Sequence, residues 1–265
     1  MEDPNPKVSG NGIKALIKAG IEVEVGVLES EVKQLNQFFS YYMKNKIPFV
    51  TLKNAMSLDG KIATISEESK WITDNEARLD AHSYRYSHDA ILVGVGTVLK
   101  DNSYLTSRFN NANKNPLRII LDRTLRTPVD SNVVLDNQAE TWIITNINVS
   151  QKKIKKYLGG NRKIIPFFPG GQHEISSLLN FLGTKGISSL LVEEGANINA
   201  SFAKEGAFNQ MITYISPKII SGALAPGPFG GDGINTMNKI WELNIMDIER
   251  IGDDIKIISK PNFTN

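Results

Sequence analysis

Cysteine is absent from this chain of 265 residues. Disulfide bonds, thiolate nucleophiles and cysteine-ligated zinc are therefore excluded. Histidine is scarce, and His82, His88 and His173 lie at no spacing that is typical of metal ligands. The sequence therefore predicts no metal site.

Strong net charge and long apolar runs are also missing. The chain has 30 basic and 28 acidic residues, so it generates no large field of the kind that non-specific binding to nucleic acid or a membrane surface needs. Apolar runs such as "AILVGVGTVL" are too short to span a bilayer, and "MEDPNPKVSG" has neither the charge nor the apolar run of a signal peptide. We expect a cytoplasmic protein with no nucleic-acid or membrane partner, although a single phosphate group remains a possible ligand.

Apolar residues make up 41% of the sequence, enough for a sizeable core in one large domain or two modest ones. Strand-like and helix-like patterns alternate, which predicts an α/β fold with a largely parallel sheet and antiparallel C-terminal strands. Strands are expected at residues 47–56, 90–95, 117–122, 133–136, 141–146, 163–167, 188–194, 210–220, 239–252 and 254–259, the last two joined at Asp253-Asp254. Helices are expected at 75–89, capped by Thr73 or Asp74, at 174–182, and from Asn197.

Residues 1–46 do not follow this alternation. They are expected to form a helix, a short strand and a second helix before the core sheet begins. The segment "GALAPGPFGGDGIN" at 222–235 is the richest in glycine and proline, and it predicts a long loop.

Two strand ends are candidate ligand sites, because ligands of open α/β sheets bind beyond the carboxyl ends of the strands. In "ILVGVGTVLKD", glycines allow close backbone approach beside Thr97, but Leu99 replaces the third glycine of a dinucleotide fingerprint. In "LLVEEGANINASF", Glu193-Glu194 ends a strand and Gly195 leads into a helix whose first amides suit a phosphate. A plain strand-to-helix turn is the alternative at both places.

A basic face is predicted on the helix at 75–89. Arg78, His82 and Arg85 are spaced so that they share this face, which is either a solvated stripe or half of an anion site that Arg108 completes. Two arginines around one phosphate would make charge-assisted, partly bidentate contacts. Trp71 is either a core residue or, given its polar neighbours, part of a site wall.

The segments that carry these residues resemble one known family. "KNAMSLDGKIA", "SKWIT", "AR" at a helix start, "DAILVGVGTVLKDNSYLTSR" and "VEEGANINASF" occur in the order found in the reductase domain of the bifunctional riboflavin biosynthesis protein RibD, over residues 47–259. The resemblance implies a dihydrofolate reductase-like, mostly parallel sheet flanked by helices, and a homodimer. It also implies the use of NADPH to reduce the ribosyl group of a phosphorylated pyrimidine, 5-amino-6-(5-phosphoribosylamino)uracil, to a ribityl chain.

The resemblance divides the chain into two parts. Residues 1–46 are similar to the C-terminal tail of the family's deaminase domain, and residues 47–265 to the reductase domain. The HxE and PCxxC zinc segments of the deaminase are missing from the sequence, so no deamination is expected from this chain. It is either a fragment or a protein that has lost that half.

Site roles follow from the same resemblance. The implied substrate-binding residues are Ser69, Arg85, Leu105, Arg108 and Glu193. The implied cofactor-binding residues are Ala55, Trp71, Thr97, Asp101, either Arg123 or Thr124, Gly195, Ala196, Asn197, Ile198, Asn199, Ala200 and Ser201. Lys53, Asp101, Glu193 or water would supply the proton that accompanies hydride transfer.

Two other functions compete with this one. A related reductase acting on a pterin would not need the paired Arg85 and Arg108, because its substrate carries no phosphate. A non-catalytic nucleotide-binding remnant would not need to retain every polar position that matches the family.

Overall fold

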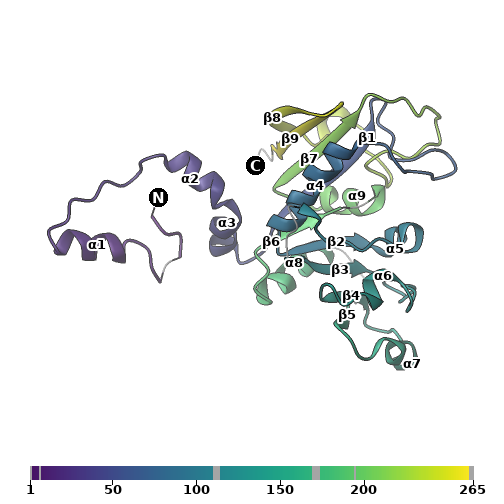
Figure 1. The fold of residues 1–265 in the computed structure, drawn as a ribbon, viewed down its shortest axis with the longest axis horizontal. Coiled ribbons are helices and arrows are strands. Elements are labelled where there is room, and N and C mark those ends of the chain that lie inside the picture. Colours follow the sequence, from purple (N-terminus) through teal and green to yellow (C-terminus); the bar gives the residue numbers. More distant parts are fainter. Residues whose placement is uncertain (1, 6, 110–113, 169–173, 194, 263–265) are drawn as a thin grey trace. The chain divides into compact units, whose positions relative to one another are not determined.

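The computed structural model describes residues 2–5, 7–109, 114–168, 174–193 and 195–262 (Figure 1). Glu194 and His173, which the sequence analysis named, lie outside these ranges. The chain divides into two units, residues 1–49 with 179–189 and residues 50–178 with 190–265.

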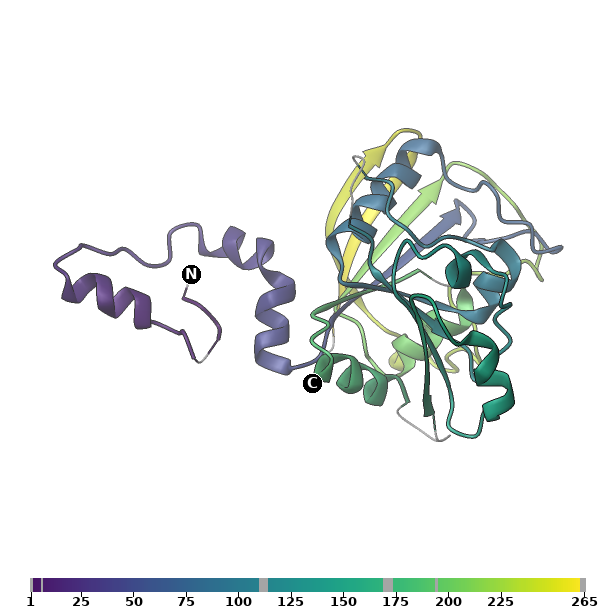
Figure 2. The same cartoon turned by 60° about the horizontal axis from the view of Figure 1, so that its bottom comes forward.

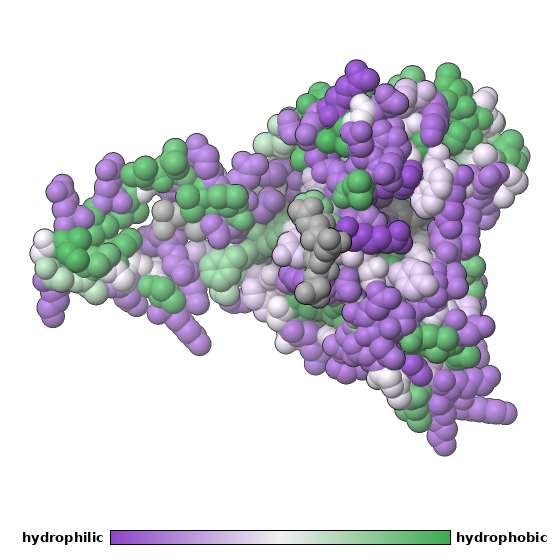
Figure 3. Space-filling view, in the orientation of Figure 1, coloured by the Kyte–Doolittle hydropathy of each residue, from purple (hydrophilic) through white to green (hydrophobic). Residues whose placement is uncertain are grey.

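The first unit contains helices α1 (Asn11–Lys18), α2 (Glu29–Leu35) and α3 (Gln37–Asn45), and none of them has a buried side chain. Phe49 packs against the rings of Phe38 and Tyr41, at centroid distances of 5.2 and 5.6 Å. Figure 3 shows apolar side chains exposed over this unit. Ile17, on α1, is 58% exposed.

The short strand predicted inside residues 1–46 is not present. The alternating apolar residues of 21–26 form no strand in the structure. An extended segment pairs its backbone groups only when a neighbouring strand is available, and alternation alone does not provide one.

Within the described residues, nine strands form one sheet in the order β5-β4-β3-β2-β6-β1-β7-β9-β8. Parallel pairings join β1 to β7, β2 to β3 and β6, β3 to β4, and β4 to β5, whereas β9 runs antiparallel to β7 and β8. The strands are β1 (Phe49–Ser57), β2 (Ala90–Gly94), β3 (Leu117–Leu121), β4 (Thr141–Asn146), β5 (Arg162–Phe168), β6 (Ser189–Val192), β7 (Gln210–Ser216), β8 (Leu243–Ile251) and β9 (Asp254–Pro261). The predicted fold class, a mostly parallel sheet with antiparallel C-terminal strands, is confirmed.

The helices that follow β1 in the chain flank this sheet (Figure 2). They are α4 (Asn75–Ser87), α5 (Val95–Asp101), α6 (Asn132–Leu135), α7 (Gln151–Ile154), α8 (Glu174–Thr184) and α9 (Ala196–Lys204), with short 3-10 turns η2 (Lys155–Tyr157) and η3 (Met237–Lys239). No helix within the described ranges is long and apolar enough to cross a membrane.

Helix α4 begins where the sequence predicted. Asp74 caps it by accepting a hydrogen bond from the backbone N–H of Ala77 at 2.8 Å. Small residues let the helix approach the sheet closely, since Ala77 and Ala81 pack on Ile212 and Tyr214 of β7. Arg85, in the last turn of α4, lies beside Glu193 at the carboxyl end of β6.

Two further predictions about local structure are wrong. Residues 133–136 were expected to form a strand, but 132–135 form the single helical turn α6, because Val133 and Val134 bury their side chains on the core and a short apolar run fits either structure. The C-terminal hairpin turns at Gly252 and Asp253 rather than at Asp253-Asp254, since Ile251 pairs with Asp254 and the turn uses the positive φ of +58° at Gly252.

Candidate active site

A buried ion cluster lies where β1, β6 and α4 meet. The Arg85 guanidinium donates from Nε and Nη2 to the two carboxylate oxygens of Glu193, at 2.6 and 2.8 Å. The Nζ of Lys53 lies 3.9 Å from Glu193 Oε2. The side chains of Glu193, Arg85 and Lys53 are only 9, 17 and 18% exposed. Arg85 and Glu193, which were both predicted to bind the substrate, thus bind each other.

The charge states in this cluster are unequal. Burial alone would raise the pKa of Glu193, but the charge and hydrogen bonds of Arg85, with the charge of Lys53, lower it to about 2. Burial lowers the pKa of Lys53, and Glu193 opposes that shift only in part. At neutral pH Glu193 is therefore an anion that holds two cations, and it is a poor proton donor.

Lys53 is the less firmly held of the two cations. Its ammonium lies 5.7 Å from the centroid of the Tyr214 ring. It makes no hydrogen bond to any side chain or backbone group in the described parts of the chain. Its N–H groups are therefore available to a ligand, whereas three nitrogens of Arg85 already bind protein oxygens.

A short segment, residues 105–108, crosses the end of α4, and we call it the strap. Arg85 Nη1 donates to the Thr106 carbonyl at 3.1 Å, Ser107 Oγ donates to the His82 carbonyl at 3.0 Å, and the Arg108 N–H donates to His82 Nδ1 at 3.3 Å. Successive residues of the strap are thus fixed to one face of α4.

The two strap residues predicted to bind substrate differ in their surroundings. Leu105 has a positive φ of +52° and a side chain that is 2% exposed in the core, so only its backbone can face a ligand. Arg108 is exposed, and its guanidinium makes no hydrogen bond or ion pair within the described residues. Arg108 therefore offers the open cation of the predicted pair.

Residues predicted to touch the cofactor lie around α5. Asp101 forms an ion pair with Lys70 at 3.2 Å, and Thr97 lies one turn before it, half-buried. Trp71 is 64% exposed, and the Arg78 guanidinium stacks 4.4 Å from its ring centroid. Because its ring is on the surface, Trp71 is not a core residue.

Ser69 and Ala55 are both half-buried. Ala55 lies on β1 and packs beside the small apolar cluster beneath α4. No hydrogen bond of the Ser69 side chain is found within the described residues. Both positions remain candidates.

The predicted segment Gly195–Ser201 opens helix α9, with Gly195 as its N-cap. The N–H of Asn199 already bonds to the Gly195 carbonyl at 3.4 Å, so the amides of Ala196, Asn197 and Ile198 precede the first intrahelical bond. The Asn199 side chain is buried and donates to Asn54 Oδ1 at 2.6 Å. The first turn is thus the part of this segment whose geometry suits an anion.

Arg123, one of the two adenosine-side candidates, is engaged with the protein. Its Nη1 lies 2.9 Å from Glu174 Oε1, and its guanidinium stacks on the Phe168 ring at 4.7 Å. Thr124 is exposed, and its carbonyl accepts from Lys153 at 2.9 Å. The Thr124 hydroxyl is therefore the more accessible of the two candidates.

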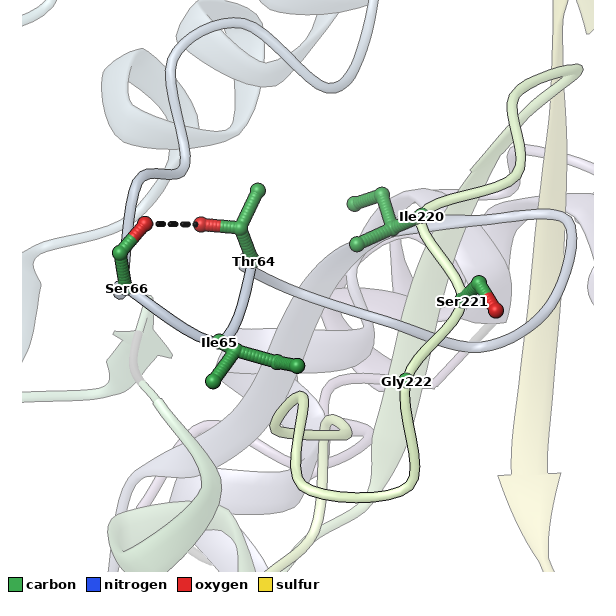
Figure 4. Close-up of a pocket in the computed structure, with 6 residues that line it drawn as sticks. All are labelled: Thr64, Ile65, Ser66, Ile220, Ser221 and Gly222. Carbon is green, nitrogen blue, oxygen red and sulfur yellow. Dashed lines mark hydrogen bonds between the residues drawn. The ribbon is translucent and has the colours of Figure 1, made fainter.

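The stretch after β1 forms a loop that is tied to the loop after β7. Asp59 accepts from the backbone N–H groups of Ile220 and Ser221 at 3.1 and 2.7 Å. The hydrogen bond from Ser57, followed by these backbone bonds, lowers the pKa of Asp59 to about 2. A hollow of about 450 Å³ lies between the loops, where Ile65 reaches Gly222 (Figure 4). It is lined by Thr64, Ile65, Ser66, Ile220, Ser221 and Gly222, none of which the sequence predicted as a site residue.

The sequence did not predict the contacts of His82, a further polar residue of this region. Its place on one face with Arg85 was visible from the helical spacing, but the contact with Arg108 was not. Burial, then the charge of Arg85, lowers the pKa of His82 to about 4. Its imidazole is therefore neutral at physiological pH.

The chain matches known proteins over most of its length. Residues 48–257 match the family model described as RibD C-terminal domain. The riboflavin biosynthesis protein RibD of Bacillus amyloliquefaciens is 43% identical over 98% of this chain and 70% of its own length, and that of Aquifex aeolicus is 39% identical over 97% and 70%.

Solved structures agree with these matches. Acinetobacter baumannii RibD superposes with a TM-score of 0.86 at 31% identity, over 98% of this chain and 71% of that one. A Thermotoga maritima protein described as a diaminohydroxyphosphoribosylaminopyrimidine deaminase/5-amino-6-(5-phosphoribosylamino)uracil reductase gives a TM-score of 0.83 at 33% identity, over 98% and 69%. A riboflavin biosynthesis reductase from yeast, at 22% identity and a TM-score of 0.62, shares the fold.

Proposed function

This chain belongs to the RibD C-terminal domain family, and we propose that it reduces the ribosyl group of 5-amino-6-(5-phosphoribosylamino)uracil to the ribityl product with NADPH. One observation carries the proposal. A buried carboxylate, Glu193, holds Arg85 and the incompletely bonded Lys53 beside a strap that presents Arg108. A phosphorylated sugar that must be protonated as it is reduced needs both an available ammonium and an anion contact.

The surroundings of α5 and α9 fit a dinucleotide. The open first turn of α9 suits a pyrophosphate, and the exposed Trp71 ring offers a flat surface beside Thr97 and Asp101. NADPH would supply a hydride to the sugar's first carbon. The protein would align this carbon with the cofactor and exclude water while the charge develops.

We assign the proton donor to Lys53 among the candidates. Glu193 is held as an anion by Arg85, and Asp101 is paired with Lys70. Burial lowers the pKa of Lys53, and a lowered pKa makes an ammonium a better general acid. Glu193 would hold Lys53 in place, while Arg108, with the unused N–H groups of Arg85 and a contact from Ser69, would bind the phosphate end of the substrate.

We also propose roles for the remaining parts. Residues 1–46 would be the end of a deaminase domain and 47–265 the reductase, since the relatives align over residues that precede the family match. The reductase would form a homodimer through the outer strand β8, where Ile245, Met246 and Ile248 are 60, 57 and 61% exposed. Use of NADPH would suit a cytoplasmic location.

The test is substrate-dependent oxidation of NADPH by the purified chain, with the product identified by mass spectrometry. We expect the ribityl compound from the phosphorylated substrate and a higher affinity for NADPH than for NADH. Equal affinity for the two nucleotides would remove the assignment of NADPH. Reduction of a dihydropterin, with no reaction of the aminouracil, would replace the proposed function by that of a pterin reductase.

A further inference from the structure

Helix α4 holds the strap through different kinds of group at successive residues. The Thr106 carbonyl accepts a hydrogen bond from Arg85 at 3.1 Å, and the Ser107 hydroxyl donates to the His82 carbonyl at 3.0 Å. The backbone of Arg108 is held by His82 Nδ1 at 3.3 Å. Among the described residues, His82 is the only side chain that anchors the backbone of Arg108.

We propose that His82 is a positioning residue for Arg108: neutral, with its proton on Nε2, it accepts the Arg108 N–H and sets where the Arg108 guanidinium meets the substrate's phosphate. The proposal rests on the proposed function, because it needs Arg108 to bind that phosphate. It gives His82 no proton transfer and no contact with substrate.

The tautomer follows from the donor. A backbone N–H can only donate, so the Nδ1 that receives it carries a lone pair, and the proton of the neutral ring must be on Nε2. An imidazolium has no acceptor and could not make this bond. The groups that face His82 are Arg85 and Glu193 across the helix end and Arg108 and the Thr106 backbone on the strap. Burial and the two arginines oppose protonation, and the lowered pKa of about 4 agrees with a neutral ring.

The hydrogen bond from the Arg108 N–H to His82 matters for binding because the Arg108 side chain is otherwise unrestrained. Its guanidinium is open, so nothing in the described part of the protein fixes the side chain before a ligand arrives. A long, flexible side chain binds an anion more tightly when its backbone is held in place, because less freedom is lost on binding. The loss of the His82 acceptor should therefore weaken phosphate binding without removing the charge.

Two variants distinguish the effect of losing the hydrogen-bond acceptor from the effect of losing the volume of the ring. His82→Leu keeps an apolar side chain of similar size and removes the acceptor, whereas His82→Asn keeps an oxygen near the position of Nδ1. We expect His82→Leu to raise KM for the phosphorylated substrate about five- to fiftyfold, with kcat and the Kd for NADPH little changed. His82→Asn should recover most of the loss, and neither variant should affect use of the dephosphorylated substrate.

The proposed function and the positioning role of His82 can fail separately, and each failure gives a different result. If the parent protein uses the phosphorylated and dephosphorylated substrates equally, the phosphate role of Arg108 is wrong and the proposed function loses its support. If the parent prefers the phosphorylated substrate but His82→Leu has an unchanged KM, only the positioning role is wrong. A role limited to general stability would lower thermal stability and the use of both substrates together.

A second measurement uses the parent protein alone, without substrate and without any variant. Nitrogen-15 NMR of the parent protein should show the His82 ring as the neutral Nε2–H tautomer between about pH 6 and 8. A ring protonated on Nδ1, or charged in this range, would overturn the proposal.

Discussion

Arg85 and Arg118 both bury a guanidinium against a carboxylate in this sheet, and they differ in what surrounds the pair. Arg118 is 1% exposed and binds Asp136 at 2.8 Å, and its other donors reach Thr141 Oγ1 at 2.9 Å and the Ala139 carbonyl at 2.7 Å. Such a pair needs no ligand to complete it. The pair of Arg85 and Glu193 carries a third charge, Lys53, which has no hydrogen bond in the described structure.

The difference indicates how to separate a structural ion pair from a functional one. A buried charge that is left incompletely bonded costs stability, and a fold tolerates it where a ligand or a reaction uses it. By this criterion we expect Arg118 to stabilise the fold, and we propose that the cluster around Glu193 is the active site.

Replacement of Lys53 should have the largest effect, and on activity alone. We expect Lys53→Met to lower kcat by about 10²- to 10⁴-fold, as for the loss of a general acid. The free energy of unfolding should change by less than about 1 kcal/mol, because Glu193 keeps Arg85. Steady-state kinetics and urea unfolding measure the two quantities. Lys156→Met, at an exposed lysine, is the control. A large loss of stability with normal kcat would reverse the assignment.

Replacement of Arg118 should lower stability and leave activity unchanged. Arg118→Met leaves Asp136 buried without its partner, so the free energy of unfolding should fall by about 3 to 5 kcal/mol. The folded fraction should keep its kcat. Urea unfolding followed by circular dichroism, with activity corrected for folded protein, makes the measurement. If Arg118→Met instead removed activity from protein of parental stability, the two arginines could not be separated in this way.

Loss of the phosphate contact should have an intermediate effect. Arg108→Ala should weaken use of the phosphorylated substrate by about 2 to 4 kcal/mol, the scale of a charge-assisted contact, and barely change NADPH affinity. Combined with removal of the phosphate, the two losses should not add, because they delete one interaction. Arg108→Lys should restore only part of the activity. Additive losses would mean that Arg108 does not bind the phosphate.

The smallest effect, about 1.4 kcal/mol for each pH unit, concerns a buried histidine of the fold. His88 is 1% exposed and lies between the Tyr84 carbonyl and Thr51 Oγ1. Burial lowers its pKa from 6.5 to about 4, so the unfolded chain binds the proton more readily between these values. Stability contributed by the neutral ring is therefore present above pH 6.5 and is lost as the pH falls toward 4, with a slope of about 1.4 kcal/mol per pH unit.

Urea unfolding at several pH values in this window checks that slope. His88→Gln, which cannot titrate, should have a shallower dependence than the parent. An unchanged slope would assign the pH dependence to other groups.

The sequence predicts the sheet well because most core strands are short apolar runs bounded by turn residues. The strand pattern misleads at 133–136 and in residues 21–26, where tertiary packing or the lack of a partner strand decides the structure. At the site, helical spacing places Arg85 and His82 on one face. It does not predict that Arg85 pairs with Glu193 or that His82 meets Arg108, since these contacts join segments far apart in the chain. No local sequence pattern predicts that Arg118 is buried and paired with Asp136.

The most direct test of the central claim follows the hydride. NADPH deuterated at the transferable position of the nicotinamide ring would be mixed with 5-amino-6-(5-phosphoribosylamino)uracil and the parent protein in a single turnover. We expect deuterium to appear on the first carbon of the ribityl chain. Deuterium that stays on the cofactor, or a product whose ribosyl group is unreduced, would contradict it.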